Sequence, residues 1–182
     1  MKKILFFITA LLLVGCVNPP QGLEKDEFTI QNLKDIDQDH YACQCKDVRL
    51  GGKVLSVDVL KNQTKIEVLS LQVSSFSAKP VLDSTTNGRF IAYLKGFVDP
   101  ESLKDQYITV KGKLTGKEMG KIDQADYQYP VVTVQAFKQW QLVKEYYYEY
   151  DDWDYYPFGF GPRWGLMGRF WFAQPKVRYV LR

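Results

Sequence analysis

Between residues 47 and 143, apolar side chains recur at every second position in five separate stretches, and this alternation limits the fold more than any other feature. A period of two is typical of β-strands that have one buried face. The pattern therefore predicts an all-β domain. The predicted strands cover residues 47–61, 64–73, 88–94, 107–114 and 131–143.

Two local signals narrow the all-β class. Gly51 and Gly52 interrupt the first strand, and paired glycines inside a strand favour a bulge or sharp curvature. Between the third and fourth strands, Asp99 fits the N-cap of a short helix, and Pro100 fits its first position. A curved first strand and a helix between strands three and four are the layout of a five-stranded OB-like barrel. A β-sandwich with the same alternation is the alternative.

The segments outside these strands are polar or mixed. Residues 74–87 and 116–129 are predicted to be loops because they are polar and lack the alternation. Before the first strand, Ile30, Leu33 and Ile36 lie three residues apart, which suits a short helix or an irregular leading segment.

The N-terminus has the pattern of a secretory leader. Lys2 and Lys3 precede an apolar run at residues 4–14, and a basic start followed by 7–15 apolar residues is typical of a signal peptide. As a helix this run would span only about 16 Å, against a hydrocarbon core of about 30 Å. The run is therefore too short to cross a bilayer.

The residues at the end of the leader resemble the bacterial lipobox. Leu13, Val14 and Gly15 precede Cys16, and the small Gly15 lets a peptidase cut before a cysteine whose thiol has been lipidated. We predict that Cys16 carries the acyl chains, such as palmitate, that hold the protein to a membrane. Val17, in place of an aspartate, points by the same resemblance to the outer membrane and a periplasm-facing protein. An ordinary secretory signal with a chance cysteine is the alternative.

The other two cysteines, Cys43 and Cys45, allow several states. The oxidising periplasm permits a disulfide, although a ring this small would be strained. Inert thiols, intermolecular or transient bonding, and metal binding with the nearby His40 are the alternatives. Such a metal cluster lacks a fourth ligand and the usual spacings, so we predict no metal.

Aromatic residues concentrate near the C-terminus, where residues 146–172 hold 13 of the 27 in the chain. Tyr and Trp favour the interface between lipid headgroups and hydrocarbon, and aromatic rings also stack on sugars. Packing on the barrel or disorder, membrane contact, and contact with a protein or glycan are all open. The candidate ligand or membrane contacts are Trp153, Tyr155, Tyr156, Trp164 and Trp171.

Composition and motifs exclude several function classes. A net charge of +3 without a clustered basic groove gives no case for nucleic-acid binding. The sequence has one histidine and no nucleophile elbow or phosphate loop, so we predict neither an enzyme nor a cofactor. Arg89 is the charged residue closest to a functional candidate, and we expect it to pair with Asp83 or Asp99.

A set of short motifs, each weak alone, occurs in order along the chain. They are Val48-Arg49-Leu50-Gly51-Gly52-Lys53-Val54, Gly88-Arg89-Phe90, Gly96-Phe97-Val98-Asp99-Pro100, Val110-Lys111-Gly112-Lys113, Tyr127-Gln128-Tyr129-Pro130-Val131-Val132 and Trp140.

Together these motifs resemble the Slp family of bacterial outer-membrane lipoproteins from Cys16 to about Trp164, although that family usually has an aromatic residue where Leu50 stands. The resemblance implies a lipid-anchored OB-like domain associated with starvation and stress, without established catalysis. We therefore expect a non-catalytic envelope role, with outer-membrane lipid and an envelope protein or glycan as partners. A periplasmic carbohydrate- or peptide-binding module that uses barrel-face and tail aromatics is the alternative.

The expected organisation has four parts. A signal peptide (residues 1–15) precedes a lipidated tether and leading segment (16–45). The OB-like barrel (46–144) is followed by an aromatic-rich tail (145–182).

Overall fold

The computed structural model of the chain describes residues 19–23, 28–36, 46–147 and 175–182. The chain divides into two compact units, Met1–Trp140 and Gln141–Arg182, and each is described by itself.

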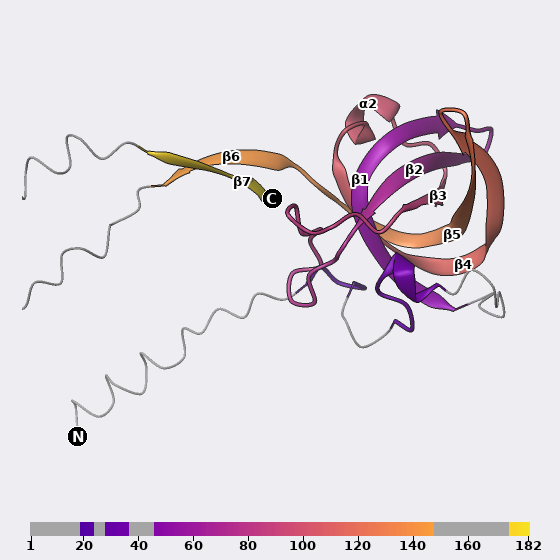
Figure 1. The fold of residues 1–182 in the computed structure, drawn as a ribbon, viewed down its shortest axis with the longest axis horizontal. Coiled ribbons are helices and arrows are strands. Elements are labelled where there is room, and N and C mark those ends of the chain that lie inside the picture. Colours follow the sequence, from indigo (N-terminus) through magenta and orange to yellow (C-terminus); the bar gives the residue numbers. More distant parts are fainter. Residues whose placement is uncertain (1–18, 24–27, 37–45, 148–174) are drawn as a thin grey trace, which may run out of the picture. The chain divides into compact units, whose positions relative to one another are not determined.

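The first unit contains a closed five-stranded barrel (Figure 1). The strand order around the barrel is β1-β2-β3-β5-β4, and β4 returns to pair with β1. All neighbouring pairs are antiparallel except β3 and β5, which are parallel. This topology, with one short helix between β3 and β4, confirms the predicted OB-like barrel. The strands are β1 (Asp47–Val59), β2 (Gln63–Leu71), β3 (Arg89–Lys95), β4 (Tyr107–Ile122) and β5 (Ala125–Trp140), and the helix is α2 (Pro100–Leu103).

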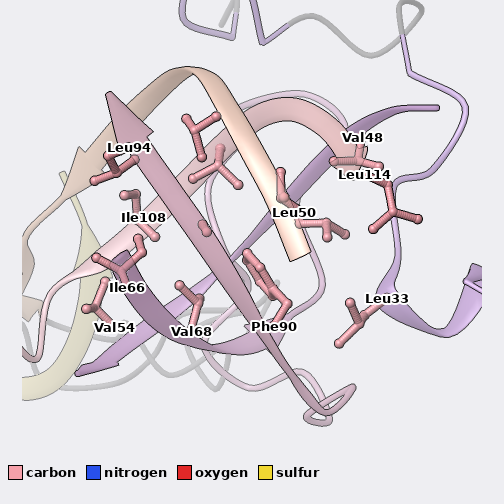
Figure 2. Packing of buried hydrophobic residues seen from close by; sticks show 14 of the residues in the cluster. Leu33, Val48, Leu50, Val54, Ile66, Val68, Phe90, Leu94, Ile108 and Leu114 are labelled. Carbon is pink, nitrogen blue, oxygen red and sulfur yellow. The ribbon is translucent and has the colours of Figure 1, made fainter. Parts of the chain in front are cut away.

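The barrel encloses one continuous apolar core, which Figure 2 shows from close by. Alternate residues of each strand point inward, so the period of two in the sequence is the inward face of the barrel wall. The largest core side chain is Phe90, which is fully buried. The inward residues of the first two strands are Val48, Leu50, Val54, Ile66 and Val68.

The glycine pair of β1 allows neighbouring chains to come close. A Cβ atom on Gly52 would lie 1.8 Å from the carbonyl oxygen of Leu69 in β2. A Cβ atom on Gly51 would lie 2.9 Å from Cγ2 of Val73. Both positions must therefore lack a side chain for the wall to close at this curvature.

The prediction of a loop at residues 116–129 is wrong. Strands β4 and β5 continue through it as an antiparallel ribbon whose turn lies between Ile122 and Ala125, and Asp123 takes a positive φ of 53° there. The outer part of this ribbon is partly or fully exposed on both faces, so its sequence has no reason to alternate. The predicted fifth strand also divides, because β5 ends at Trp140 and a new strand begins at Leu142.

The leading segment is part of the barrel unit. Residue Ile30 forms a parallel bridge with Val48, and Asn32 caps a 3-10 turn, η2 (Leu33–Asp35). The side chains of Ile30, Leu33 and Ile36 are buried in the core cluster. Their spacing of three therefore marks an irregular segment with a short turn, as predicted.

The second unit contains a two-stranded antiparallel sheet of β6 (Leu142–Tyr147) and β7 (Lys176–Leu181). Glu145 in β6 forms ion pairs with Arg178 and Arg182. Tyr147 pairs with Lys176, so the two strands of this sheet are joined by residues 148–174, which lie outside the described part of the chain.

Candidate functional site

The site residues predicted from sequence lie outside the described part of the chain. They are Cys16, Cys43, Cys45, Trp153, Tyr155, Tyr156, Trp164 and Trp171. Their roles stay predictions, and the candidate site is built from the residues that adjoin Cys16 in sequence.

The described chain begins with a closed turn just after Cys16. The amide of Leu23 donates a hydrogen bond to the carbonyl of Pro20 over 2.9 Å, and Gly22 has a φ of +83°. A turn with positive φ at its third position favours glycine there. Leu23 is only 2% exposed, so the chain is fixed to the folded unit within seven residues of Cys16.

Arg49 holds this turn from the outer side of β1. The side chain is fully buried, its Nη1 donates to the carbonyl of Leu23 over 2.7 Å, and its Nη2 donates to Oε1 of Gln31 over 2.9 Å. The guanidinium also lies 5.6 Å from the ring centre of Phe28, and Nζ of Lys111 lies 5.4 Å from the same centre. The buried guanidinium of Arg49 thus binds residues 19–23 and residues 28–36, the two described parts of the leading segment, to the barrel wall.

The connection between β2 and β3 packs against the same turn. Leu23, Val73 and Ala78 form a small apolar cluster of their own. The hydroxyl of Thr109 donates to the carbonyl of Ala78 over 2.6 Å, and the indole Nε1 of Trp140 donates to that hydroxyl over 3.0 Å. This chain of hydrogen bonds fixes the connection on the wall. We call the following residues the outer cluster: Leu23, Phe28, Arg49, Val73, Ala78, Thr109 and Trp140.

Strand register explains why the outer cluster forms. Arg49 faces Lys111 and Gly51 faces Thr109 in the β1–β4 pair, so these four residues alternate with the inward core positions. Because Gly51 has no side chain, Val73 fits against the wall beside Thr109. The outward face of β1 and β4 is therefore covered by two segments that are distant in sequence.

A second covered region lies on the outward face of β2 and β3. Nη1 of Arg89 is 2.8 Å from Oε1 of Glu67, so the predicted pairing of Arg89 with Asp83 or Asp99 is wrong. The hydroxyl of Tyr129 in β5 donates to the same carboxylate over 3.2 Å. Its hydrogen bond to Glu67 raises the pKa of Arg89, and burial raises the pKa of Tyr129.

The β4 side of the ribbon makes a matching set of contacts. Lys65 in β2 forms an ion pair with Glu118, whose other carboxylate oxygen accepts a hydrogen bond from the hydroxyl of Tyr93 over 2.8 Å. The hydrogen bond from Lys65 lowers the pKa of Glu118, and the same bond raises the pKa of Lys65. Burial raises the pKa of Tyr93.

These contacts place the β4–β5 ribbon over strands β2 and β3. OB barrels bind oligosaccharides and oligonucleotides with this face and with the β1–β2 and β4–β5 loops. Here the charges on the face are paired with one another and with the ribbon. A ligand at this face would have to displace the ribbon, so the geometry does not favour binding there.

Arg49 was not predicted from sequence as an organising residue, and Arg89 was the predicted candidate instead. The sequence does contain a signal that the leading segment packs on the barrel. Leu23 and Phe28 are apolar residues with charged and polar neighbours, and such side chains need a surface to pack on.

The closed barrel and its docked leading segment place the chain in the class of small OB-like barrel proteins, here with a fold that starts a few residues after a lipobox-like sequence. Comparison with known proteins agrees with this assignment. The profile of the "Outer membrane lipoprotein Slp family" matches residues 13–171, and the chain belongs to this family. Membership confirms the predicted family and the outer-membrane localisation.

Three relatives are similar over most of their length. An uncharacterized protein of Haemophilus influenzae is 52% identical over 98% of both chains. The uncharacterized lipoprotein YeaY of Escherichia coli is 33% identical over 79% of this chain and 75% of its own. The outer membrane protein Slp of Escherichia coli is 29% identical over 90% of this chain and 86% of its own. No solved structure matches the chain.

Within the described residues, no helix has both the length and the apolarity to cross a bilayer.

Proposed function

We propose that the protein is acylated at Cys16 and works as a non-catalytic module of the outer-membrane envelope, held close to the lipid that carries its anchor. The observation that supports this most is the closed turn at Pro20–Leu23, which begins four residues after Cys16. Four residues span at most about 14 Å when fully extended. A barrel fixed this close to a lipobox cysteine suits a protein that acts at the membrane surface.

The non-catalytic part of the proposal rests on how the polar groups of the two covered faces are used. Arg49 and Thr109 hold backbone segments together, and the Glu67 and Glu118 carboxylates are engaged in ion pairs that fix the ribbon. Each of these groups has a structural partner that accounts for it. The partners of the module are then outer-membrane lipid through the anchor, and an envelope protein or glycan.

Acylation is tested by labelling growing cells with radioactive palmitate. The wild-type chain and a Cys43→Ser variant should incorporate label and stay with the outer membrane after washing in plain buffer and in high salt. The Cys16→Ser variant should incorporate none and appear in the soluble fraction. Label on the Cys16→Ser variant, or none on the wild type, would refute the proposed anchor.

A stress-associated role is the second part of the proposal, and it rests on the family resemblance. A deletion strain should lose viability or envelope integrity faster than its parent in prolonged stationary phase, and the wild-type gene should restore both. Restoration by the Cys16→Ser variant would show that the anchor is not needed for the role.

A peptidoglycan pull-down distinguishes a glycan-binding role from a structural role in the envelope. It is carried out with the full chain and with a variant that lacks residues 148–174. Retention of the full chain and loss in the variant would favour binding through the aromatic-rich segment. No retention of either protein favours the structural role.

A further inference from the structure

The connection between β2 and β3 presents one strongly exposed aromatic side chain beside the start of the folded chain. Phe76 is 78% exposed, the highest value among the large apolar residues that the structure describes. It is flanked by Ser75 and Ser77, which are small and polar. Covering the exposed ring of a phenylalanine with an apolar partner is favourable by about 1.5–3 kcal/mol.

The backbone around Phe76 is a closed and well-anchored turn. The amide of Ser74 donates to the carbonyl of Lys79 over 2.9 Å, and the amide of Ala78 donates back to the carbonyl of Ser74 over 3.0 Å. Val73 and Pro80 form a β-bridge at its base. Little conformational freedom is left to be lost when the ring of Phe76 is covered, so burial would be favoured.

The base of this turn is also where the anchored end of the chain is attached. Ala78 and Val73 pack on Leu23, and the carbonyl of Ala78 is fixed through Thr109. Phe76 is two residues from Ala78, and the turn at Leu23 begins four residues after Cys16. A fully extended chain of four residues reaches about 14 Å, so Pro20, the first residue of the turn whose Leu23 packs on Val73 and Ala78, lies within about 14 Å of Cys16.

From this placement we propose that Phe76 inserts into the leaflet that holds the acyl anchor and gives the barrel a second, fixed contact with the membrane. The inference rests on the proposed acylation of Cys16. One anchor point would leave the barrel free to rotate on its tether, whereas two points fix which face lies against the bilayer. Insertion of one phenylalanine favours the docked over the lifted barrel by about tenfold.

Phe97 provides a matched control. It is 74% exposed, almost as much as Phe76, and it follows the opposite end of β3. The seven residues of β3 place the two ends of the strand about 20 Å apart, and the connection that carries Phe76 joins the end opposite to Phe97. A barrel docked through the Phe76 turn therefore leaves position 97 in water.

The experiment compares Ser75→Cys, which keeps Phe76 in place, with Phe97→Cys, each combined with Cys43→Ser and Cys45→Ser and labelled with a small fluorophore. The acylated full-length chains are placed in vesicles of phosphatidylethanolamine and phosphatidylglycerol and titrated with iodide. Circular dichroism confirms that both variants fold. We expect a quenching constant about tenfold lower at position 75, beside Phe76, than at position 97.

Equal quenching at the two positions in vesicles would overturn the proposal. Protection of position 75 that also occurs without lipid, in the Cys16→Ser form, and that grows with protein concentration would assign the turn to a second copy of the chain and would overturn the proposal as well. Protection that is found in whole envelopes but is absent from pure vesicles would show that the turn contacts a protein partner, and this outcome would also overturn the proposal. Palmitate incorporation is measured first on the same sample, so a failed anchor is distinguished from an exposed Phe76.

Discussion

Replacement of Arg49 by alanine tests how strongly the leading segment is fixed to the barrel. The arginine is fully buried and donates hydrogen bonds to the carbonyl of Leu23 and to the side chain of Gln31. Hydrogen bonds that involve a charged group contribute about 1.5–3 kcal/mol each, and the contact with Phe28 adds about 1 kcal/mol. We therefore expect the free energy of unfolding to fall by about 4 kcal/mol in Arg49→Ala.

Arg89 is the matched control for this substitution. It is also an arginine in the barrel wall, but its side chain is 31% exposed and its ion pair with Glu67 is partly exposed to water. Partly exposed pairs contribute about 1 kcal/mol or less, so Arg89→Ala should cost about that much. Arg49→Lys should fall between the two, at about 2 kcal/mol, because an ammonium group cannot donate in the forked geometry of a guanidinium.

The measurement is urea unfolding of the soluble Cys16→Ser form, followed by circular dichroism. A loss of 4 kcal/mol is a large part of the 5–15 kcal/mol that stabilises a typical domain, so the transition midpoint should move clearly. Hydrogen exchange should show that protection of residues 28–36 is lost first in Arg49→Ala. If Arg49→Ala and Arg89→Ala had equal midpoints, the argument that Arg49 fixes the leading segment would be wrong.

Three further substitutions test other parts of the structure. Gly52→Ala should prevent the barrel from closing, since its Cβ atom would lie 1.8 Å from a backbone carbonyl of β2, and the variant should be aggregated or unfolded by circular dichroism. Glu118→Gln should lower the unfolding free energy by about 1 kcal/mol at neutral pH, because it removes the ion pair with Lys65. Since the pKa of Glu118 is lowered from 4.5, this contribution is complete above pH 4.5 and is lost as the pH falls through the lowered pKa, so acid titrations of variant and wild type should converge. Thr109→Val should cost about 2 kcal/mol, because it leaves a buried carbonyl and the indole of Trp140 without their hydrogen-bond partner, and a thermal midpoint unchanged from wild type would contradict this.

The barrel could be predicted from sequence because its signals are local. Alternation marks each inward face, Asp99 accepts a hydrogen bond from the amide of Glu101 as an N-cap does, and Gly51 and Gly52 stand where the wall needs close approach. Each of these signals depends only on residues that lie within a few positions of one another in sequence. The order of the predicted strands and helix along the chain was then sufficient to predict the topology of the barrel.

The β4–β5 ribbon could not be predicted in the same way. Its outer part is held by contacts between Glu118 and Lys65 and between Tyr129 and Glu67, which are 53 and 62 residues apart in sequence. These contacts need single polar side chains at given positions and leave the intervening residues unconstrained. A polar stretch without alternation therefore gives the same pattern for a loop and for a solvated ribbon.

The role of Arg49 was hidden for a related reason. Alternation places it on the outward face of β1, where an arginine is expected to lie in water. Its burial comes from Leu23, 26 residues earlier, and from the apolar residues that accompany it. Sequence reasoning located the face correctly and had no means to show that another segment covers it.

The two covered faces of the barrel differ in how firmly they are closed. On the outer face of β1 and β4, a fully buried arginine and a buried hydroxyl bind backbone carbonyls, and removal of either leaves buried polar groups unpaired. On the outer face of β2 and β3, the closing groups are partly exposed ion pairs, which water can replace at a cost of about 1 kcal/mol each. The barrel is thus closed most firmly on the face where the leading segment joins it. Under the proposed acylation of Cys16, this is also the side on which a force from the membrane would act.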